Sequence, residues 1–220
     1  MRFLSLDLKG LLLSLLIGML VLVLGGGNGV FLLSILVFFL VLSAMATEIG
    51  KKRKRQMRVY EKVRGWKNVA ANGLVPLLIV FVLFLDTHLG YNNTGVLVLA
   101  YVSSVSAITS DKFASEIGIL GGLPRDIFTF KRLERGLSGG ITLLGLGAAF
   151  VAAFVVSSGL IIQGYPISII LLSGSSGFLG NIVDSVFGHF EERGIGNKYS
   201  SNLICGLFGA LFPLLIITIV

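Results

Sequence analysis

Seven long apolar runs most constrain how this chain of 220 residues can fold. They cover residues 8–24, 30–46, 69–87, 94–110, 138–158, 166–187 and 202–219. Each run is close to the roughly 20 residues that an α-helix needs to cross the hydrocarbon core of a bilayer. None shows the strict polar and apolar alternation of a transmembrane β-barrel. The runs therefore predict an all-α, polytopic bundle of about seven transmembrane helices, organised as one integral membrane domain over residues 1–220.

Composition supports a membrane protein and argues against other classes. Apolar residues make up 55% of the chain and charged residues only 13%, whereas a soluble domain carries about a quarter charged residues. The 29 glycines suit helices that pack closely within a membrane. Cys205 is the single cysteine, so the sequence contains neither a disulfide framework nor the cysteine and histidine spacing of a zinc site.

The basic residues predict the orientation in the membrane. All 18 Lys and Arg lie in four places: the N-terminus (Arg2 and Lys9) and the segments 51–67, 112–135 and 193–198. With seven spans these places share one side, which the positive-inside rule makes cytoplasmic, so the N-terminus is expected in the cytoplasm. The net charge of +7 does not indicate nucleic-acid binding, because no folded soluble module accompanies the basic cluster. Contact with anionic lipid headgroups explains that cluster.

A polar stripe enters the third apolar run from the cytoplasmic side. Arg64, Asn68 and Asn72 recur every four residues, and Lys67 adjoins them on a helix. Polar side chains that face lipid are costly, so these side chains are expected to point inward. Hydrogen bonding between helices explains the asparagines without a ligand. The alternative is a clamp for a lipid headgroup or a substrate phosphate.

Acidic side chains lie at the cytoplasmic ends of two predicted spans. Asp111 and Glu116 end the fourth span, and Asp184 lies in the sixth. An acid in an apolar span indicates a functional site, and Mg²⁺ is commonly held by one or two carboxylates together with substrate phosphates. We expect Asp111 and Asp184 to meet around Mg²⁺ and to act in catalysis. Glu116 is a third candidate ligand or catalytic residue, with a second metal, orientation of water or a salt bridge to Arg125 as alternatives. His189 is expected at the surface.

Basic side chains and glycines follow the fourth span. The connection to the fifth span is predicted to be a loop with at most a short interfacial helix. Its basic side chains could surround a polyphosphate, although a solvated positive-inside loop is the simpler reading. They are Arg125, Lys131, Arg132 and Arg135. Its closing Ser-Gly-Gly sequence could start the fifth span, with the serine as N-cap and free N–H groups for an anion. No Walker A sequence occurs. The predicted nucleotide-binding positions are Arg125, Lys131, Ser138, Gly139 and Gly140.

Several of these segments together resemble a known membrane family. In order they are RGWKNVAANG, SDKFASEIG, RDIFTFK, GLSGGITLLG and GFLGNIVDSVFGH. They are similar to the motifs of the family of phytyl-phosphate kinase and transmembrane protein nineteen, over most of residues 64–190. Two positions depart from that family's pattern: Lys112 stands in place of Thr, and Leu137 in place of Thr or Ser.

The resemblance implies a kinase that transfers the γ-phosphoryl group of a nucleotide, typically CTP, to an isoprenoid monophosphate of the phytyl or geranylgeranyl type. Its product would be the diphosphate, and its active site would face the cytoplasm at helix ends within residues 64–190. The acceptor phosphate would then lie on Arg64, Lys67, Asn68 and Asn72. A CTP-dependent cytidylyltransferase acting on a lipid phosphate and a small membrane transporter are the alternatives. The sequence leaves homo-oligomerisation open.

Overall fold

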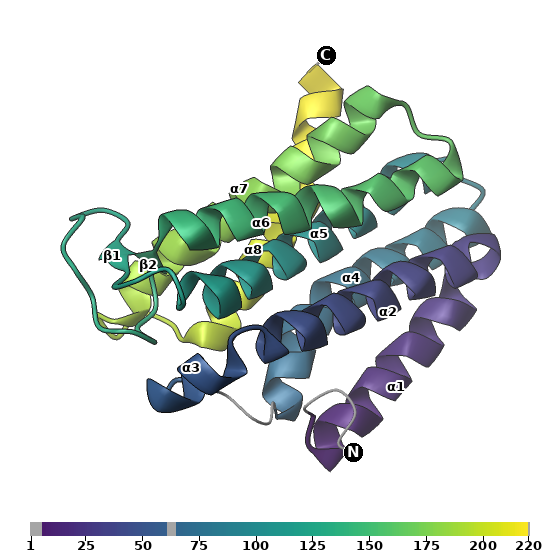
Figure 1. Cartoon of the computed structure of the whole chain (residues 1–220). Coiled ribbons are helices and arrows are strands. Elements are labelled where there is room, and N and C mark those ends of the chain that lie inside the picture. Colours follow the sequence, from purple (N-terminus) through teal and green to yellow (C-terminus); the bar gives the residue numbers. More distant parts are fainter. Residues whose placement is uncertain (1–5, 61–64, 220) are drawn as a thin grey trace.

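The computed structural model describes residues 6–60 and 65–219 (Figure 1). The α-helices are α1 (Leu8–Leu24), α2 (Gly29–Glu48), α3 (Lys51–Gln56), α4 (Trp66–His88), α5 (Thr94–Gly118), α6 (Leu143–Ser157), α7 (Ile167–Glu191) and α8 (Lys198–Ile219). Two 3₁₀ segments, η2 (Gly26–Asn28) and η3 (Ser158–Gln163), and two short strands, β1 (Arg125–Asp126) and β2 (Gly140–Ile141), complete the described elements. The predicted position Arg64 lies outside the described residues.

Six helical segments in the described part of the chain are long and apolar enough to cross a membrane. They are η2 with α2, α4, α5, α6 with η3, α7 and α8. The seventh apolar run forms α1, which has only 17 residues and would span about 25 Å at 1.5 Å per residue. The prediction of an all-α, polytopic membrane protein is therefore confirmed, with one helix shorter than the other six.

The basic segments gather at one end of the bundle. In Figure 1 the two strands and the connection from α7 to α8 lie on the left, α3 lies at the lower left, and the described N-terminal end lies at the bottom. The C-terminal end of α8 and the connection from α4 to α5 lie toward the opposite side. The helix ends that carry the acidic and basic candidates are thus close to one another.

Helix α5 is the central element of the bundle and contacts α2, α4, α6, α7 and α8. Every residue from 98 to 110 is buried, and many of them are small. Buried hydroxyl groups need partners, and those of α5 donate across helix contacts: Ser106 Oγ to Ala153 O at 2.9 Å and Ser110 Oγ to Ala149 O at 3.0 Å. Small polar residues therefore allow close approach and also connect the helices, as expected in a membrane.

Glycines of α7 and α8 complete this close packing. A Cβ at Gly177 would lie 2.0 Å from Ser106 Oγ, and one at Gly209 would lie 2.8 Å from Ser103 O. These positions have no room for a side chain, so the predicted packing role of the glycine-rich spans is a steric requirement at these helix contacts.

The substitution Gly177→Val is expected to lower the free energy of unfolding by about 1–3 kcal/mol, the usual cost of overpacking a close contact. Gly147→Val on α6 is the matched control, because a Cβ there meets nothing within 4 Å. Thermal unfolding in detergent micelles compares the two. Equal melting temperatures for both variants would show that the contact between α5 and α7 is looser than described.

The connection from α5 to α6 is a loop, as predicted, and it carries a small strand pair in place of the optional short interfacial helix. Strands β1 and β2 pair antiparallel, with Arg125 opposite Ile141. The intervening turn is closed by Asp126, whose Oδ1 accepts from the N–H of Phe128 at 3.1 Å and of Thr129 at 2.7 Å. This local capping by an Asp side chain competes with helix formation and explains the turn.

Candidate functional site

A cavity of about 540 Å³ lies at the basic end of the bundle, where α5, α7, α8 and the connection from α5 to α6 meet. Its ionisable lining side chains are Arg58, Asp111, Lys112, Glu116, Arg135, Asp184 and Lys198. The polar lining also includes Ser115, Ser138, Thr142, Ser201 and Asn202. The volume is within the range of small-molecule sites, and four cations beside three acids suit a metal-bound polyphosphate.

The structure brings Asp111 and Asp184 together in this cavity, from α5 and α7. Their carboxyl groups are close enough to interact directly, and the hydroxyl of Ser201 on α8 adjoins Asp184. Asp184 Oδ1 is buried and has no hydrogen-bond partner among the described residues. Two adjacent carboxylates repel unless a cation or a shared proton lies between them, so this pair suits a cation.

The donor set fits Mg²⁺ better than a structural transition metal. Within residues 6–60 and 65–219, no group of three or more His, Cys, Asp or Glu side chains is arranged to hold a metal. Zinc sites usually take three or four such protein ligands, whereas Mg²⁺ is commonly bound by one or two carboxylates, substrate phosphates and water. A carboxylate pair in a cavity with basic walls matches the second pattern.

Glu116 lines the same cavity but its carboxylate is engaged by lysines. Lys54 Nζ lies 2.7 Å from Glu116 Oε2, and Lys112 forms an ion pair with the other oxygen. Lys54 is only 1% exposed and also donates to the backbone oxygens of Ala46 and Thr47 at the end of α2. Glu116 thus ties α5 to α2 and α3. The salt bridge considered for Glu116 exists, but with these lysines rather than Arg125.

The glycine-rich loop before α6 is fixed against the end of α7. Gly139 has a φ of +75°, and a Cβ there would lie 2.5 Å from the backbone nitrogen of His189. Only glycine meets both requirements without strain. The N–H of Ser138 donates to Glu192 Oε1 at 2.8 Å. Ser138, Gly139 and Gly140 all line the cavity, but the N–H of Ser138 is already bonded to Glu192.

The expectation that Ser138 caps the fifth span is wrong. Helix α6 begins at Leu143, five residues later, and Thr142 is its N-cap, with Oγ1 accepting from Gly145 N at 3.0 Å. Pairing of β2 with β1 keeps Gly140 and Ile141 extended. The helix therefore cannot start at the serine.

Two predicted phosphate ligands lie outside the cavity. Arg125 is exposed and donates to Phe130 O at 3.2 Å, and Lys131 is exposed on the same turn. Arg135 takes their place, since it lines the cavity and its Nε is buried with no partner among the described residues. Lys112 and Lys198 join it in the lining. Lys112 directly follows Asp111 in the sequence, and this adjacency is the one sequence feature that indicates a lysine in the cavity wall.

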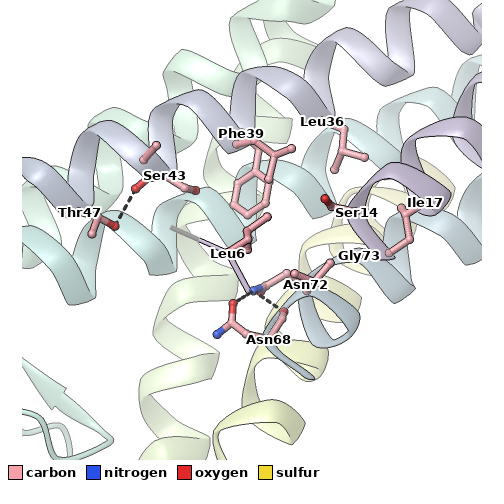
Figure 2. Close-up of a pocket in the computed structure, with 13 residues that line it drawn as sticks. Leu6, Ser14, Ile17, Leu36, Phe39, Ser43, Thr47, Asn68, Asn72 and Gly73 are labelled. Carbon is pink, nitrogen blue, oxygen red and sulfur yellow. Dashed lines mark hydrogen bonds between the residues drawn. The ribbon is translucent and has the colours of Figure 1, made fainter. Parts of the chain in front are cut away.

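The predicted acceptor clamp is separate from the cavity. Asn68 and Asn72 line a different hollow between α1, α2 and α4 (Figure 2). Asn72 Nδ2 donates to the backbone oxygen of Asn68 at 3.0 Å and to its Oδ1 at 3.1 Å. Lys67 is exposed beside Trp66. Among residues 6–60 and 65–219, the hydrogen bonds between these two asparagines run along α4.

The structure corrects the expectation that His189 is at the surface. His189 is buried, and its Nδ1 lies 2.5 Å from Asp126 Oδ2. Arg193 contacts the other ring nitrogen and donates to His189 O at 2.9 Å. The hydrogen bonds from His189 and Thr129 hold the pKa of the Asp126 carboxyl well below its ordinary value. This cluster anchors the strand pair to α7, and no spacing in the sequence indicated it.

The lowered pKa of Asp126 predicts an acid-sensitive anchor. Stability from a carboxyl with a depressed folded pKa is fully present above its ordinary value, about 3.9, and is lost as the pH falls toward the folded value. Asp126→Asn is expected to lower the melting temperature at neutral pH. The difference in melting temperature between this variant and the unmodified protein should become smaller below about pH 4. The control is Glu134→Gln, on the same connection and exposed. A difference in melting temperature that stays constant with pH would contradict the role of Asp126 as an acid-sensitive anchor.

The comparisons with known proteins are consistent with this architecture. The chain is 36% identical to Uncharacterized membrane protein MJ0933 of Methanocaldococcus jannaschii over 187 residues, covering 84% of this chain and 75% of that protein. It is 30% identical to Protein PGR of Arabidopsis thaliana over 178 residues, covering 70% of this chain and 62% of that protein. No solved structure matches.

A family model extends the match to nearly the whole chain. The model described as integral membrane protein DUF92 matches residues 1–205. That range includes every cavity residue on α5, α7, α8 and the connection from α5 to α6. The chain therefore belongs to the family of integral membrane proteins DUF92.

Proposed function

We propose that this protein is a membrane kinase that transfers the γ-phosphoryl group of a nucleotide, with CTP favoured, to an isoprenoid monophosphate. The observation that carries the proposal is the meeting of Asp111 and Asp184 in a cavity with cationic walls. Phosphoryl transfer depends mainly on positioning and on neutralising charge. The motif resemblance supplies the nucleotide and the acceptor class.

In the proposed reaction, an oxygen of the acceptor monophosphate attacks the γ-phosphorus of the nucleotide. The bond between the γ-phosphorus and the bridging oxygen to the β-phosphate breaks, and that oxygen remains on the nucleoside diphosphate. The new bond gives the isoprenoid diphosphate. Because the acceptor is already an anionic phosphate, the protein need not supply a strong general base.

The cavity residues divide between binding the metal and binding phosphate. Asp111 and Asp184 would hold Mg²⁺, which when bound supplies positive charge to the nucleotide phosphates. Arg135 and Lys198 are placed to bind the phosphate oxygens, and the guanidinium can do so with two parallel hydrogen bonds. Gly139 lets the loop pack against α7 and so holds Ser138 and Gly140 at the cavity wall. Lys112 is shared with Glu116 and adds charge to the same wall.

The location of the cavity supports a substrate whose hydrocarbon chain stays in the bilayer while its phosphate reaches the cavity. The cavity lies at the end of helices that are long enough to span a membrane. A soluble nucleotide can enter from the aqueous side, while an isoprenoid phosphate can present its headgroup from the membrane. Such a placement lets both substrates meet without taking the hydrocarbon chain into water.

The proposal is tested with purified protein, Mg²⁺, a panel of nucleoside triphosphates and phytyl, geranylgeranyl and farnesyl monophosphates. The expected result is an isoprenoid diphosphate that carries label from the γ-position of the nucleotide. Label from the α-position would indicate cytidylyl transfer instead. The absence of product with every nucleotide and acceptor would contradict the kinase assignment.

A further inference from the structure

A second hollow, of about 60 Å³, lies between α1, α2 and α4 (Figure 2). Its apolar wall includes Ile17 of α1 and Leu36 and Phe39 of α2, all buried. Its polar positions include Ser43 and Asn72. We call this hollow the α1–α2–α4 groove. It is distinct from the cavity that holds the acidic pair.

The groove follows from the way α1 and α2 are arranged. The two helices are joined at η2 and diverge toward the end of the bundle that carries the cavity (Figure 1). Helix α4 closes the space between them, and its Gly73 lets α1 approach, since a Cβ there would lie 2.7 Å from Ile17 Cδ1. Along α2 the lining runs from Leu36 to Thr47, a distance of about 16 Å at 1.5 Å per residue.

The groove adjoins the cavity at its polar end. Thr47 lines the groove, and its Oγ1 donates to Oε1 of Glu116, which lines the cavity, at 3.1 Å. Ser43, one turn earlier, is 4% exposed, and its Oγ has no hydrogen-bond partner among the described residues. A buried hydroxyl without a partner is costly. Polarity therefore falls along α2, from the cavity end toward Leu36.

This gradient matches a single-chain amphiphile with a phosphate at one end. We propose that the α1–α2–α4 groove holds the part of the isoprenoid chain next to the phosphate of the acceptor, with the phosphate directed past Thr47 toward the cavity. The assignment rests on the proposed kinase function. The hollow is too small for a whole isoprenoid chain, so it would hold the part next to the phosphate while the rest of the chain lies in the bilayer.

The groove orients the acceptor rather than adding much affinity. Lipid tails are as apolar as the groove wall, so moving an isoprenoid chain from the bilayer into the groove gains little from the hydrophobic effect. Its benefit is a fixed position of the headgroup, and correct placement of reactants can contribute greatly to rate. A blocked groove should therefore reduce kcat/KM for the acceptor without changing KM for the nucleotide.

Photolabelling maps the position of the isoprenoid chain directly. The full-length protein in lipid nanodiscs is irradiated with a geranylgeranyl monophosphate that carries a photoreactive diazirine on its chain, without nucleotide, and the labelled peptides are sequenced. Label is expected within residues 36–47 and 68–73. It should be displaced by unlabelled geranylgeranyl monophosphate and not by an equal excess of phosphatidylcholine. Label on other helices, or equal displacement by phosphatidylcholine, would overturn the assignment.

A matched pair of variants gives a second measurement. Ala44→Phe places a ring in the groove and is expected to reduce labelling of the groove, and kcat/KM for the acceptor, at least tenfold. Val41→Phe adds a ring one turn earlier on α2, at a position that is 46% exposed and outside the groove, and should change neither. Equal effects of both variants would overturn the assignment.

The outcomes separate the groove from the kinase proposal. Labelled groove peptides from a protein that forms no isoprenoid diphosphate would support the groove and reject the kinase. Product formation with label confined to other helices would support the kinase and reject the groove.

Discussion

Asp184→Asn is expected to reduce γ-phosphoryl transfer at least about 100-fold, in line with the loss of a group that stabilises charge in a transition state. The amide keeps the size of the side chain but removes the negative charge that, with Asp111, would attract Mg²⁺. The effect should fall on kcat and on the Mg²⁺ concentration needed for half-maximal rate. Initial rates over a Mg²⁺ titration measure both quantities.

Asp86→Asn is the matched control, because the same chemical change is made at the far end of α4. Asp86 is also buried, and it accepts from the backbone and side-chain nitrogens of Asn93. This variant should lose some thermal stability and retain its rate per folded molecule. A comparable loss of rate in both variants would show that the effect of Asp184→Asn is a general effect on folding.

Arg135→Gln is expected to raise KM for the nucleotide by about 10- to 100-fold, because one charge-assisted hydrogen bond contributes about 1.5–3 kcal/mol. This guanidinium lines the cavity and has a buried Nε without a partner among the described residues, so it is placed to bind a phosphate. KM for the acceptor should change little. Initial-rate kinetics with each substrate varied in turn provides the measurement.

Arg132→Gln serves as its control, since Arg132 carries the same charge, lies three residues earlier and is exposed outside the cavity. The two variants lose equal net charge. If Arg132→Gln raised KM for the nucleotide as much as Arg135→Gln, the cation would act through general charge attraction rather than through contact in the cavity.

The helices and the meeting of Asp111 with Asp184 could be predicted from the sequence. Apolar length determines which segments can span a membrane, and both acids lie at helix ends that the basic loops assign to one side. A carboxylate that faces lipid is costly, so both acids must face the interior of the bundle. At one end of a small bundle, that places them beside each other.

Finer details could not be predicted, because they depend on a few backbone angles and on contacts between distant segments. The positive φ of Gly139 and the pairing of β1 with β2 decide that Arg135, and not Arg125, lines the cavity. The contact of His189 with Asp126 joins residues 63 positions apart. Because α1 and α2 diverge, Asn68 of α4 lines the α1–α2–α4 groove and not the cavity with the acidic pair. None of these arrangements has a periodic pattern that a single sequence reveals.

Binding of Mn²⁺, as a spectroscopic substitute for Mg²⁺, shows without any turnover whether Asp111 and Asp184 hold a metal. Electron paramagnetic resonance of the full-length protein with a non-hydrolysable CTP analogue would report bound Mn²⁺ and its coupling to phosphorus. We expect one phosphate-coupled ion per chain, lost in both Asp111→Asn and Asp184→Asn and retained in Asp86→Asn. Unchanged binding of Mn²⁺ in Asp184→Asn would contradict this expectation.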